Sequence, residues 1–404
     1  MHDETARARL AVFAVFALNG AGFATWAARI PDVKAGLGLT AGQLGIVLLF
    51  LSVGSLAGLP LSGRIADRIG PAATVRFGGA VWTVGLLVAA LGVTVFASPT
   101  VLAVGLAAVG FGVGVWDVSM NLEGAAVERR LGRAIMPHFH AAFSAGTVAS
   151  TLVAAALSWA GVSVGVHFAV GGVLIAAGML VAVRGFLGRD GDELTPEDPG
   201  APAPVAPRSA WLEPRTLLIG LVALVAAFTE GTANDWIAVA FVDGHGLPPW
   251  AGVLAFATFL GAMTTGRLIG TALLDRFGRV PVLRALLVMA AVGTLLVVFG
   301  SPALAYVGAA IWGLGTALGF PVGMSAAADD ESRAAARVSV VATIGYAAFL
   351  AGPPLLGFLG DHHGVLRALL AVGALIVPAL LVLPAVREPA SAALDPESSG
   401  RIVH

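Results

Sequence analysis

Cysteine is absent from this sequence of 404 residues, and charged residues make up only 12% of it. Without cysteine, disulfide bonds, thiolate metal sites and cysteine nucleophiles are all excluded. Soluble proteins carry about 25% charged residues, whereas 58% of this chain is apolar. A globule with so few charges could not cover itself with a wettable surface, so the composition predicts a protein surrounded by lipid.

Signatures of enzymes and of nucleic-acid binding are also missing. The formal net charge is −1, which gives no general attraction to nucleic acid, and the eight histidines are scattered without the spacing of a metal site. The sequence has no phosphate-binding Gly-x-x-x-x-Gly-Lys-Ser/Thr loop and no soluble domain large enough to hydrolyse ATP. We therefore expect no metal, no cofactor and no enzymatic reaction.

Long apolar runs dominate what is present. Residues 10–28 carry no charge and are long enough to cross the hydrocarbon core, which takes about 20 residues. The segment after them lacks the small-residue pattern of signal cleavage, so we expect a retained span. Breaks at Pro99 and Pro302 divide two longer runs into hairpins. We expect twelve helices, near residues 10–29, 41–63, 73–97, 100–124, 138–160, 163–186, 215–240, 250–274, 281–299, 303–327, 337–358 and 364–386.

Residues 187–213 separate six of these helices from the other six. This segment is rich in proline and acidic residues and cannot bury enough apolar surface to fold, so it is expected to be a flexible linker. The sequence thus predicts an all-α membrane protein with an N-terminal six-helix bundle (1–186) and a C-terminal six-helix bundle (214–386). Residues 387–404 are expected to form a disordered tail.

The basic residues orient the chain, because lysine and arginine accumulate in cytoplasmic loops. Of the 23 basic residues, all but Arg29, Lys34 and Arg367 lie in segments that share one side of the membrane if the N-terminus is cytoplasmic. We therefore expect both termini and the linker in the cytoplasm, and a monomeric multi-pass protein of a bacterial inner membrane.

The two halves of the chain repeat each other. Pro99 has a counterpart in Pro302, 203 residues later, and Gly110-Phe111-Gly112 is matched at the same offset by Gly313-Leu314-Gly315. The loop Asp67-Arg68-Ile69-Gly70 returns as Asp275-Arg276-Phe277-Gly278. Paired repeats of this kind place a substrate site between two pseudo-symmetric bundles that move around it.

The segment Gly63-Arg64-Ile65-Ala66-Asp67-Arg68-Ile69-Gly70, with Arg76 downstream, resembles the signature loop of the major facilitator superfamily. The second copy departs from it, with Thr271 in place of the first glycine. The resemblance implies the fold of that family and alternating access by two six-helix bundles. Independently of the resemblance, charge-assisted hydrogen bonds at the helix end beside Asp67 and Arg68 can hold the neighbouring bundle in one state and release it in the other. We therefore expect a conformational gate formed by Gly63, Asp67, Arg68, Gly70, Arg76, Asp275, Arg276 and Gly278. The alternative is that the arginines only anchor the loop on the cytoplasmic side.

Ionisable residues inside spans are costly and usually functional. Glu230 lies near the middle of the seventh span, with Asn234 on the same helical face and Asp235 next to it. A carboxyl group at that depth should face a cavity or carry a proton. Glu230, Asn234 and Asp235 are therefore candidates for proton coupling or substrate binding; the alternative is a structural pairing with another interior polar group.

Other polar residues form stripes on neighbouring spans. Asp117 and Asn121 lie in the cytoplasmic half of the fourth span, where Asp117 is expected to pair with His140 at the start of the fifth. Tyr346 ends a similar stripe in the eleventh span. Such stripes either line the central cavity or hold helices together by hydrogen bonds.

The first span contributes Asn19 and Trp26, which share one face. Trp26 is suited to stack on a substrate ring, or else belongs to the aromatic belt at the membrane surface. Arg29, at the outer end of this span, is expected to pair with Asp235 as an outer gate.

These features together predict a secondary active transporter, coupled to protons, for a small solute. The fifth helix lacks the Gly-Pro-rich signature typical of drug exporters, and the segment from Asp117 to His140 resembles a bacterial subgroup related to the fucose permeases. That resemblance favours a sugar-like hydrophilic solute. The alternatives are a proton-driven multidrug or metabolite exporter and a non-transporting membrane receptor.

Overall fold

A computed structural model describes residues 2–187, 210–330 and 332–388. Twelve segments of the described chain are long and apolar enough to cross a membrane, as expected from the sequence. Their helices are α1 (His2–Ala27), α2 (Ile30–Leu37), α3 (Ala41–Ile69), α4 (Pro71–Thr94), α5 (Pro99–Leu131), α6 (Met136–Trp159), α7 (Val164–Ala182), η1 (Val183–Gly185), α9 (Pro214–Val239), η3 (Ala240–Gly244), α10 (Pro249–Phe277), α11 (Arg279–Phe299), α12 (Pro302–Thr316), α13 (Gly319–Ala327), α14 (Ala334–His363), α15 (Val365–Ala368), α16 (Leu370–Val382) and η4 (Leu383–Val386).

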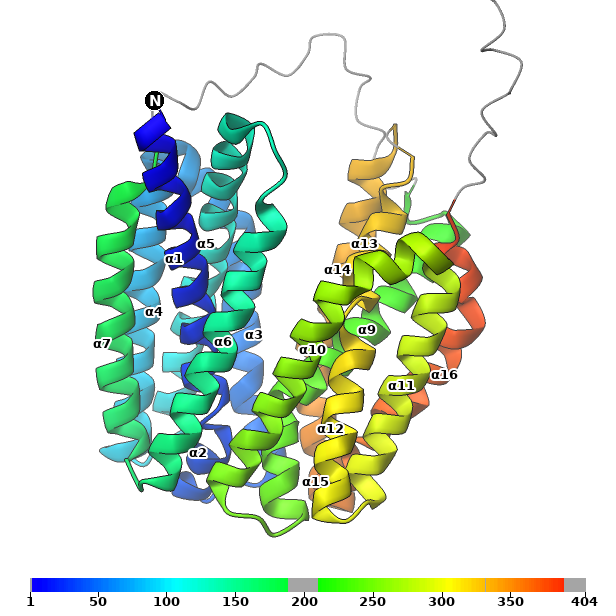
Figure 1. Cartoon of the computed structure of the whole chain (residues 1–404). Coiled ribbons are helices and arrows are strands. Elements are labelled where there is room, and N and C mark those ends of the chain that lie inside the picture. Colours follow the sequence, from blue (N-terminus) through cyan, green and yellow to red (C-terminus); the bar gives the residue numbers. More distant parts are fainter. Residues whose placement is uncertain (1, 188–209, 331, 389–404) are drawn as a thin grey trace, which may run out of the picture.

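The helices form two bundles (Figure 1). The N-terminal bundle contains α1 to α7 and η1, and the C-terminal bundle contains α9 to α16 with η3 and η4. Most of the expected linker and tail lie outside the described residues. The first expected span is longer than predicted, because α1 begins at His2 and the chain then continues into the short helix α2.

The expected repeat is visible in matching backbone details. Gly70 joins α3 to α4 with φ +83°, and Gly278 joins α10 to α11 with φ +76°. Only glycine adopts such angles without strain. Within each bundle a glycine pair brings two helices together: a Cβ added to Gly105 of α5 would lie 2.7 Å from the carbonyl oxygen of Gly85 in α4. Gly308 and Gly293 form the equivalent pair between α12 and α11, at the same 2.7 Å.

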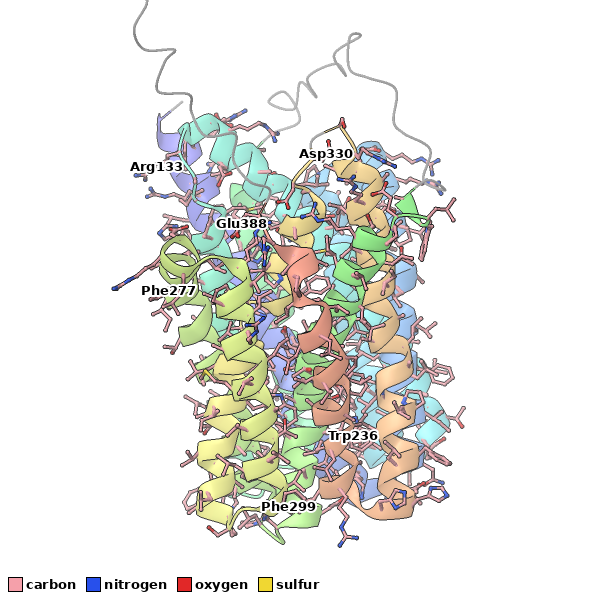
Figure 2. The ribbon with its side chains drawn as sticks, turned by 90° about the vertical axis from the view of Figure 1, so that its right-hand side faces the viewer. Arg133, Trp236, Phe277, Phe299, Asp330 and Glu388 are labelled. Atoms are coloured by element: carbon pink, nitrogen blue, oxygen red, sulfur yellow. The ribbon has the colours of Figure 1, made fainter. Side chains whose placement is uncertain are left out.

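The bundles meet at the end of the molecule that lies away from the start of α1 and the end of η4 (Figure 1). There Lys34 Nζ of α2 lies 2.8 Å from Asp243 Oδ2, and Thr40 Oγ1 donates a hydrogen bond of 3.1 Å to Asp361 Oδ2. Arg133, Asp330 and Glu388 mark the other end, which we call the terminus end (Figure 2). The bundles spread apart at the terminus end (Figure 1). The structure is therefore closed at one end only.

Glycines permit this closure, because α3 and α14 approach through faces without side chains. A Cβ added to Gly45 would collide with the Pro353 carbonyl group and lie 3.3 Å from Gly357 Cα. A Cβ added to Gly357 would lie 2.6 Å from the Ala41 carbonyl oxygen. Small residues commonly allow such close helix packing in membranes.

An ion-pair network joins the helix ends of the C-terminal bundle at the terminus end. Glu213 pairs with Arg333 and, over 2.7 Å, with Arg337 Nε. Asp329 lies 2.7 Å from Arg279 and 2.9 Å from Arg215. The network thus links the starts of α9, α11 and α14 with the end of α13.

Gly45→Leu should open the closed end. Overpacking costs about 1–3 kcal/mol, and each ~1.4 kcal/mol changes a population tenfold, so we expect about a tenfold larger open population. Because the sequence lacks cysteine, Ser55→Cys gives a single label site on the wall of a cavity that lies between the two bundles. The rate of its reaction with an impermeant maleimide, added from the side that is closed here, should rise. Gly373→Leu is the control, because a Cβ at Gly373 meets nothing within 4 Å. An unchanged rate in Gly45→Leu would contradict the role assigned to this contact.

Glu213→Gln should destabilise the protein in a pH-dependent way. Burial would raise the pKa of Glu213, but hydrogen bonds from Arg337 and Thr216 and the charges of Arg337 and Arg333 outweigh burial and lower the pKa. The stabilisation is therefore complete above the unfolded-state pKa of a glutamate and is lost as the pH falls through the lower folded-state value. Thermal unfolding of both proteins should show a Tm gap at neutral pH that closes in acid. Glu4→Gln, which removes an exposed pair of 3.8 Å, should show almost no gap; a Glu213→Gln gap that is independent of pH would refute this account.

Candidate functional site

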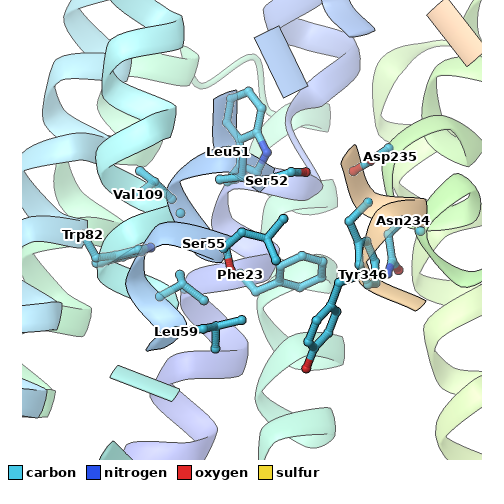
Figure 3. Close-up of a pocket in the computed structure, with 17 residues that line it drawn as sticks. Phe23, Leu51, Ser52, Ser55, Leu59, Trp82, Val109, Asn234, Asp235 and Tyr346 are labelled. Atoms are coloured by element: carbon cyan, nitrogen blue, oxygen red, sulfur yellow. The ribbon is translucent and has the colours of Figure 1, made fainter. Parts of the chain in front are cut away.

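A cavity of about 230 Å³ lies between the two bundles. Its N-terminal wall comes from α1, α3, α4 and α5, and its C-terminal wall comes from α9 and α14. Figure 3 shows Asn234, Asp235 and Tyr346 on the C-terminal side, across from Ser52, Ser55 and Trp82. Most of the other lining side chains are aromatic or aliphatic. We call this space the central cavity.

The helix α9 places two adjacent polar side chains in this wall. Asn234 and Asp235 both line the central cavity, and Asp235 also lines a small adjoining space beside Trp236. The Oδ1 atom of Asn234 is buried without a hydrogen-bond partner among the described residues. The side-chain carboxylate of Asp235 makes no hydrogen bond or ion pair with any residue in the described part of the chain. The wall therefore presents two acceptors that no described protein group occupies.

A second cavity of about 210 Å³ adjoins the first and shares Phe23 and Asn234 with it. Glu230 lies in its wall, where Oε1 accepts a hydrogen bond of 3.0 Å from Arg267 Nη2 of α10. The side chains are 21% and 35% exposed, and both line this cavity, so the ion pair faces space between the helices. We call this space the charged cavity.

Arg267 also stabilises a break in the tenth span. The span was expected to be one helix from 303 to 327, but α12 ends at Thr316 and α13 begins at Gly319. Arg267 Nε donates a hydrogen bond of 3.3 Å to the Ala317 carbonyl oxygen within this break. Irregular backbone at membrane depth needs such a partner, because no water is available in hydrocarbon.

Sequence reasoning missed Arg267 as a site residue. Arg267 is the only ionisable residue between Pro249 and Leu274, and a lone charge inside a span is the signal that could have identified it. It had been assigned to the cytoplasmic side together with the loop arginines. The side chain instead reaches Glu230 inside the protein.

Only some of the other expected site residues line a cavity. Trp26 and Tyr346 line the central cavity, whereas Asn19 is 3% exposed and lines neither cavity. The expected Asp117–His140 pair is absent from the described residues, because the His140 ring packs edge-on against Phe16 at 5.2 Å.

The side chain of Asn121 makes a hydrogen bond within its own helix and lines neither cavity. Its Nδ2 atom donates to the backbone oxygen of Asp117, over 2.9 Å. The Asp117 carboxylate has no ion-pair or hydrogen-bond partner in the described part of the chain. Its charge is therefore not neutralised by a described neighbour.

The expected outer gate between Arg29 and Asp235 does not form. Arg29 is 2% exposed and stays within the N-terminal bundle, with Nε 3.4 Å from Asp32 Oδ2. Its Nη2 donates a hydrogen bond of 2.7 Å to the Val162 carbonyl oxygen. Full burial of the guanidinium requires these partners, so Arg29 anchors the bend between α1 and α2 to the loop between α6 and α7.

The residues of the expected gate loops lie at the terminus end. Gly70 and Gly278 occupy the two helix junctions, and Asp67, Arg68, Arg76, Asp275 and Arg276 are exposed on their helices. A Cβ added to Gly63 would meet nothing within 4 Å. No other backbone segment therefore approaches Gly63 closely in this conformation.

The described residues contain no group of three or more histidine, aspartate and glutamate side chains that could hold a metal ion. The chemistry of the cavities is instead that of one ion pair, unoccupied acceptors and aromatic walls. Aromatic and aliphatic walls with a few polar groups suit the binding of a small organic molecule.

Comparisons with known proteins agree with this architecture. The family model described as Major Facilitator Superfamily matches residues 12–271 and 251–402. An uncharacterised MFS-type transporter of Yersinia pestis is 32% identical over 348 residues, which cover 86% of this chain and 87% of the relative. Among solved structures, a mutant of the nucleoside transporter NupG has a TM-score of 0.78 and 13% identity, and covers 95% of this chain and 99% of its own.

The fold is also similar to that of a variant of the Escherichia coli fucose:proton symporter FucP. The TM-score is 0.60 with 13% identity, over 94% of this chain and 98% of that structure. Likenesses at this identity show the fold alone, whereas the family model and the Yersinia relative show common descent. This chain belongs to the major facilitator superfamily of membrane transporters.

Proposed function

We propose that this protein is a secondary active transporter that moves a small organic solute and protons by alternating access. Family membership makes it a transporter rather than an enzyme. The observation that carries the proposal is a cavity between two bundles that are closed together at one end and spread at the other. A binding site exposed to one side at a time is the geometry that alternating access requires.

The distribution of basic residues supports an orientation of the protein in the membrane. Arginines gather at the terminus end, around the α3–α4, α5–α6 and α10–α11 junctions, and such residues accumulate on the cytoplasmic side. We therefore place the terminus end in the cytoplasm of a bacterial cell, with the protein as a monomer in the inner membrane. The conformation is then inward-facing.

The ion pair between Glu230 and Arg267 supports coupling to protons. Protonation would remove the negative charge of the carboxylate and so release the arginine. Because the pair faces the charged cavity and Arg267 also holds the break between α12 and α13, protonation of Glu230 would change the contacts of a discontinuous helix. Such a coupling between charge and a two-state element can bias the bundles toward one conformation.

The composition of the cavity wall bears on the solute. A sugar-like molecule, which the sequence favours, needs many hydrogen-bonding partners, and the central cavity offers few beside Ser52, Ser55 and the acceptors of α9. Aromatic and aliphatic side chains predominate instead, including Phe23 and Leu51. This observation favours the second candidate, a proton-driven exporter of organic molecules. The relative direction of solute and proton movement distinguishes the two candidates. A proton-coupled importer moves the solute and the proton in the same direction, whereas a proton-driven exporter moves them in opposite directions.

Glu230→Gln should abolish transport driven by a pH gradient while leaving the protein folded. The amide keeps the shape of the side chain but cannot bind or release a proton. Purified protein in sealed vesicles is tested with labelled sugars and organic ions under pH gradients of either sign, and folding is checked by size-exclusion chromatography. Glu4→Gln, which is outside both cavities, should transport like the wild type. Gradient-driven transport that survives in Glu230→Gln would remove this residue from the coupling mechanism.

A further inference from the structure

Asp235 is an unusual carboxyl group for its position. It lines the central cavity, yet it has no ion-pair or hydrogen-bond partner within the described residues. Glu230, one turn earlier on α9, is neutralised by Arg267 at 3.0 Å. An isolated charge inside a membrane protein is costly, so Asp235 needs either a proton or a positively charged ligand.

A second acceptor lies beside this carboxyl group. The buried Oδ1 atom of Asn234 lacks a hydrogen-bond partner within the part of the chain described, and Asn234 shares the wall of the central cavity with Asp235 (Figure 3). Two acceptors without donors match the hydrogen-bonding capacity of an ammonium group, which has donors only. Neither a neutral acceptor nor an anion would satisfy them.

The surrounding side chains suit a cation that carries a flat apolar body. Phe23, Trp26, Tyr346 and Phe349 line the same cavity. Aromatic faces attract ammonium ions as well as apolar rings. The walls therefore suit both parts of such a molecule.

The charges near the central cavity also favour a positively charged ligand. Asp117 of α5 has no ion-pair partner among the described residues and is near enough to Tyr346 for electrostatic interaction. Glu230 and Arg267 cancel each other. The field in the cavity therefore favours positive charge.

We propose that the central cavity binds an organic ammonium ion with a ring, whose N–H groups donate to Asp235 and Asn234 while its ring lies among the aromatic side chains. A proton competes with the ammonium group for Asp235, so the site holds one or the other. This inference rests on the proposed transport function, because it names the class of solute and implies exchange of an organic cation for a proton.

Several other titratable groups face this region and enter any interpretation of pH effects. Glu230 lies on the same helix and is held by Arg267 of α10; Asp117 projects from α5, and His140 from α6 lies within electrostatic range of Arg267. Tyr346 comes from α14, whereas the cavity residues of α1 and α3 carry no titratable side chain. A pH effect assigned to Asp235 must therefore disappear in a variant of Asp235 itself.

The test measures binding of a matched series to purified full-length protein in detergent, by calorimetry and thermal shift. The probes are phenethylamine, its neutral counterpart 2-phenylethanol, the anion 3-phenylpropanoate and methylamine, which has the charge without the ring. We expect phenethylamine to bind about tenfold or more tightly than each of the others, because a charged hydrogen bond and ring burial each contribute about that factor.

Two variants test whether Asp235 is responsible for the tighter binding of phenethylamine. Asp235→Asn should weaken phenethylamine binding about tenfold or more and leave 2-phenylethanol unchanged. Asp330→Asn removes a carboxylate from the terminus end and should bind like the wild type. If Asp235→Asn fails to fold, the pH dependence of binding by the wild-type protein still tests the proposal. Phenethylamine affinity should fall by up to about tenfold per pH unit in acid, with one proton released per molecule bound, and 2-phenylethanol affinity should not change.

Equal affinity for the amine and the alcohol would overturn the assignment, as would the absence of binding by every ammonium probe. So would binding by Asp235→Asn with wild-type affinity and wild-type pH dependence. The outcomes separate this inference from the proposed function. Proton-driven transport without preference for ammonium ions would defeat the inference alone, and selective binding of ammonium ions without gradient-driven transport would defeat the proposed function alone.

Discussion

Hydrocarbon is the constraint on which this structure depends. A charged side chain in the middle of a bilayer costs about 2.5–3.5 kcal/mol on insertion scales, and this chain places Glu230, Arg267 and Asp235 within its spans. The fold accommodates them on the faces where the two bundles meet. Glu230 and Arg267 neutralise each other, and Asp235 faces a cavity. The charged side chains within the spans and the cavities therefore lie in the same region, between the two bundles.

The alternating access that we propose requires the same surfaces to separate and rejoin, and this limits how they can be built. Large interlocking side chains would hold the bundles in one state, whereas Gly45 and Gly357 let α3 and α14 meet through backbone. The polar contacts at the closed end, the Lys34–Asp243 ion pair and the hydrogen bond from Thr40 to Asp361, can be replaced by water when the end opens. Rigid glycine packing inside each bundle, such as Gly85 with Gly105, keeps the moving parts intact.

Sequence reasoning predicted the fold because hydropathy and the internal repeat are local signals. Charge-free runs identified twelve spans, and the spacing of Glu230 and Asn234 placed both on the cavity face of α9. Residues that depend on contacts between distant segments were predicted poorly. Arg267 meets Glu230 from another helix, 37 residues away. Arg29 was assigned to a gate because its position at the outer end of a span does not reveal that Asp32 and Val162 hold it inside one bundle.

The central claim is that the two ends of the pathway open alternately, and distances between spin labels test it most directly. The chain has no cysteine to remove. One pair, Arg133→Cys with Asp275→Cys, reports on the terminus end, and another, Phe96→Cys with Phe299→Cys, reports on the opposite end. When pH or an organic cation shifts the populations, the first distance should shorten as the second lengthens. Distances that stay fixed, or that lengthen together at both ends, would contradict alternating access.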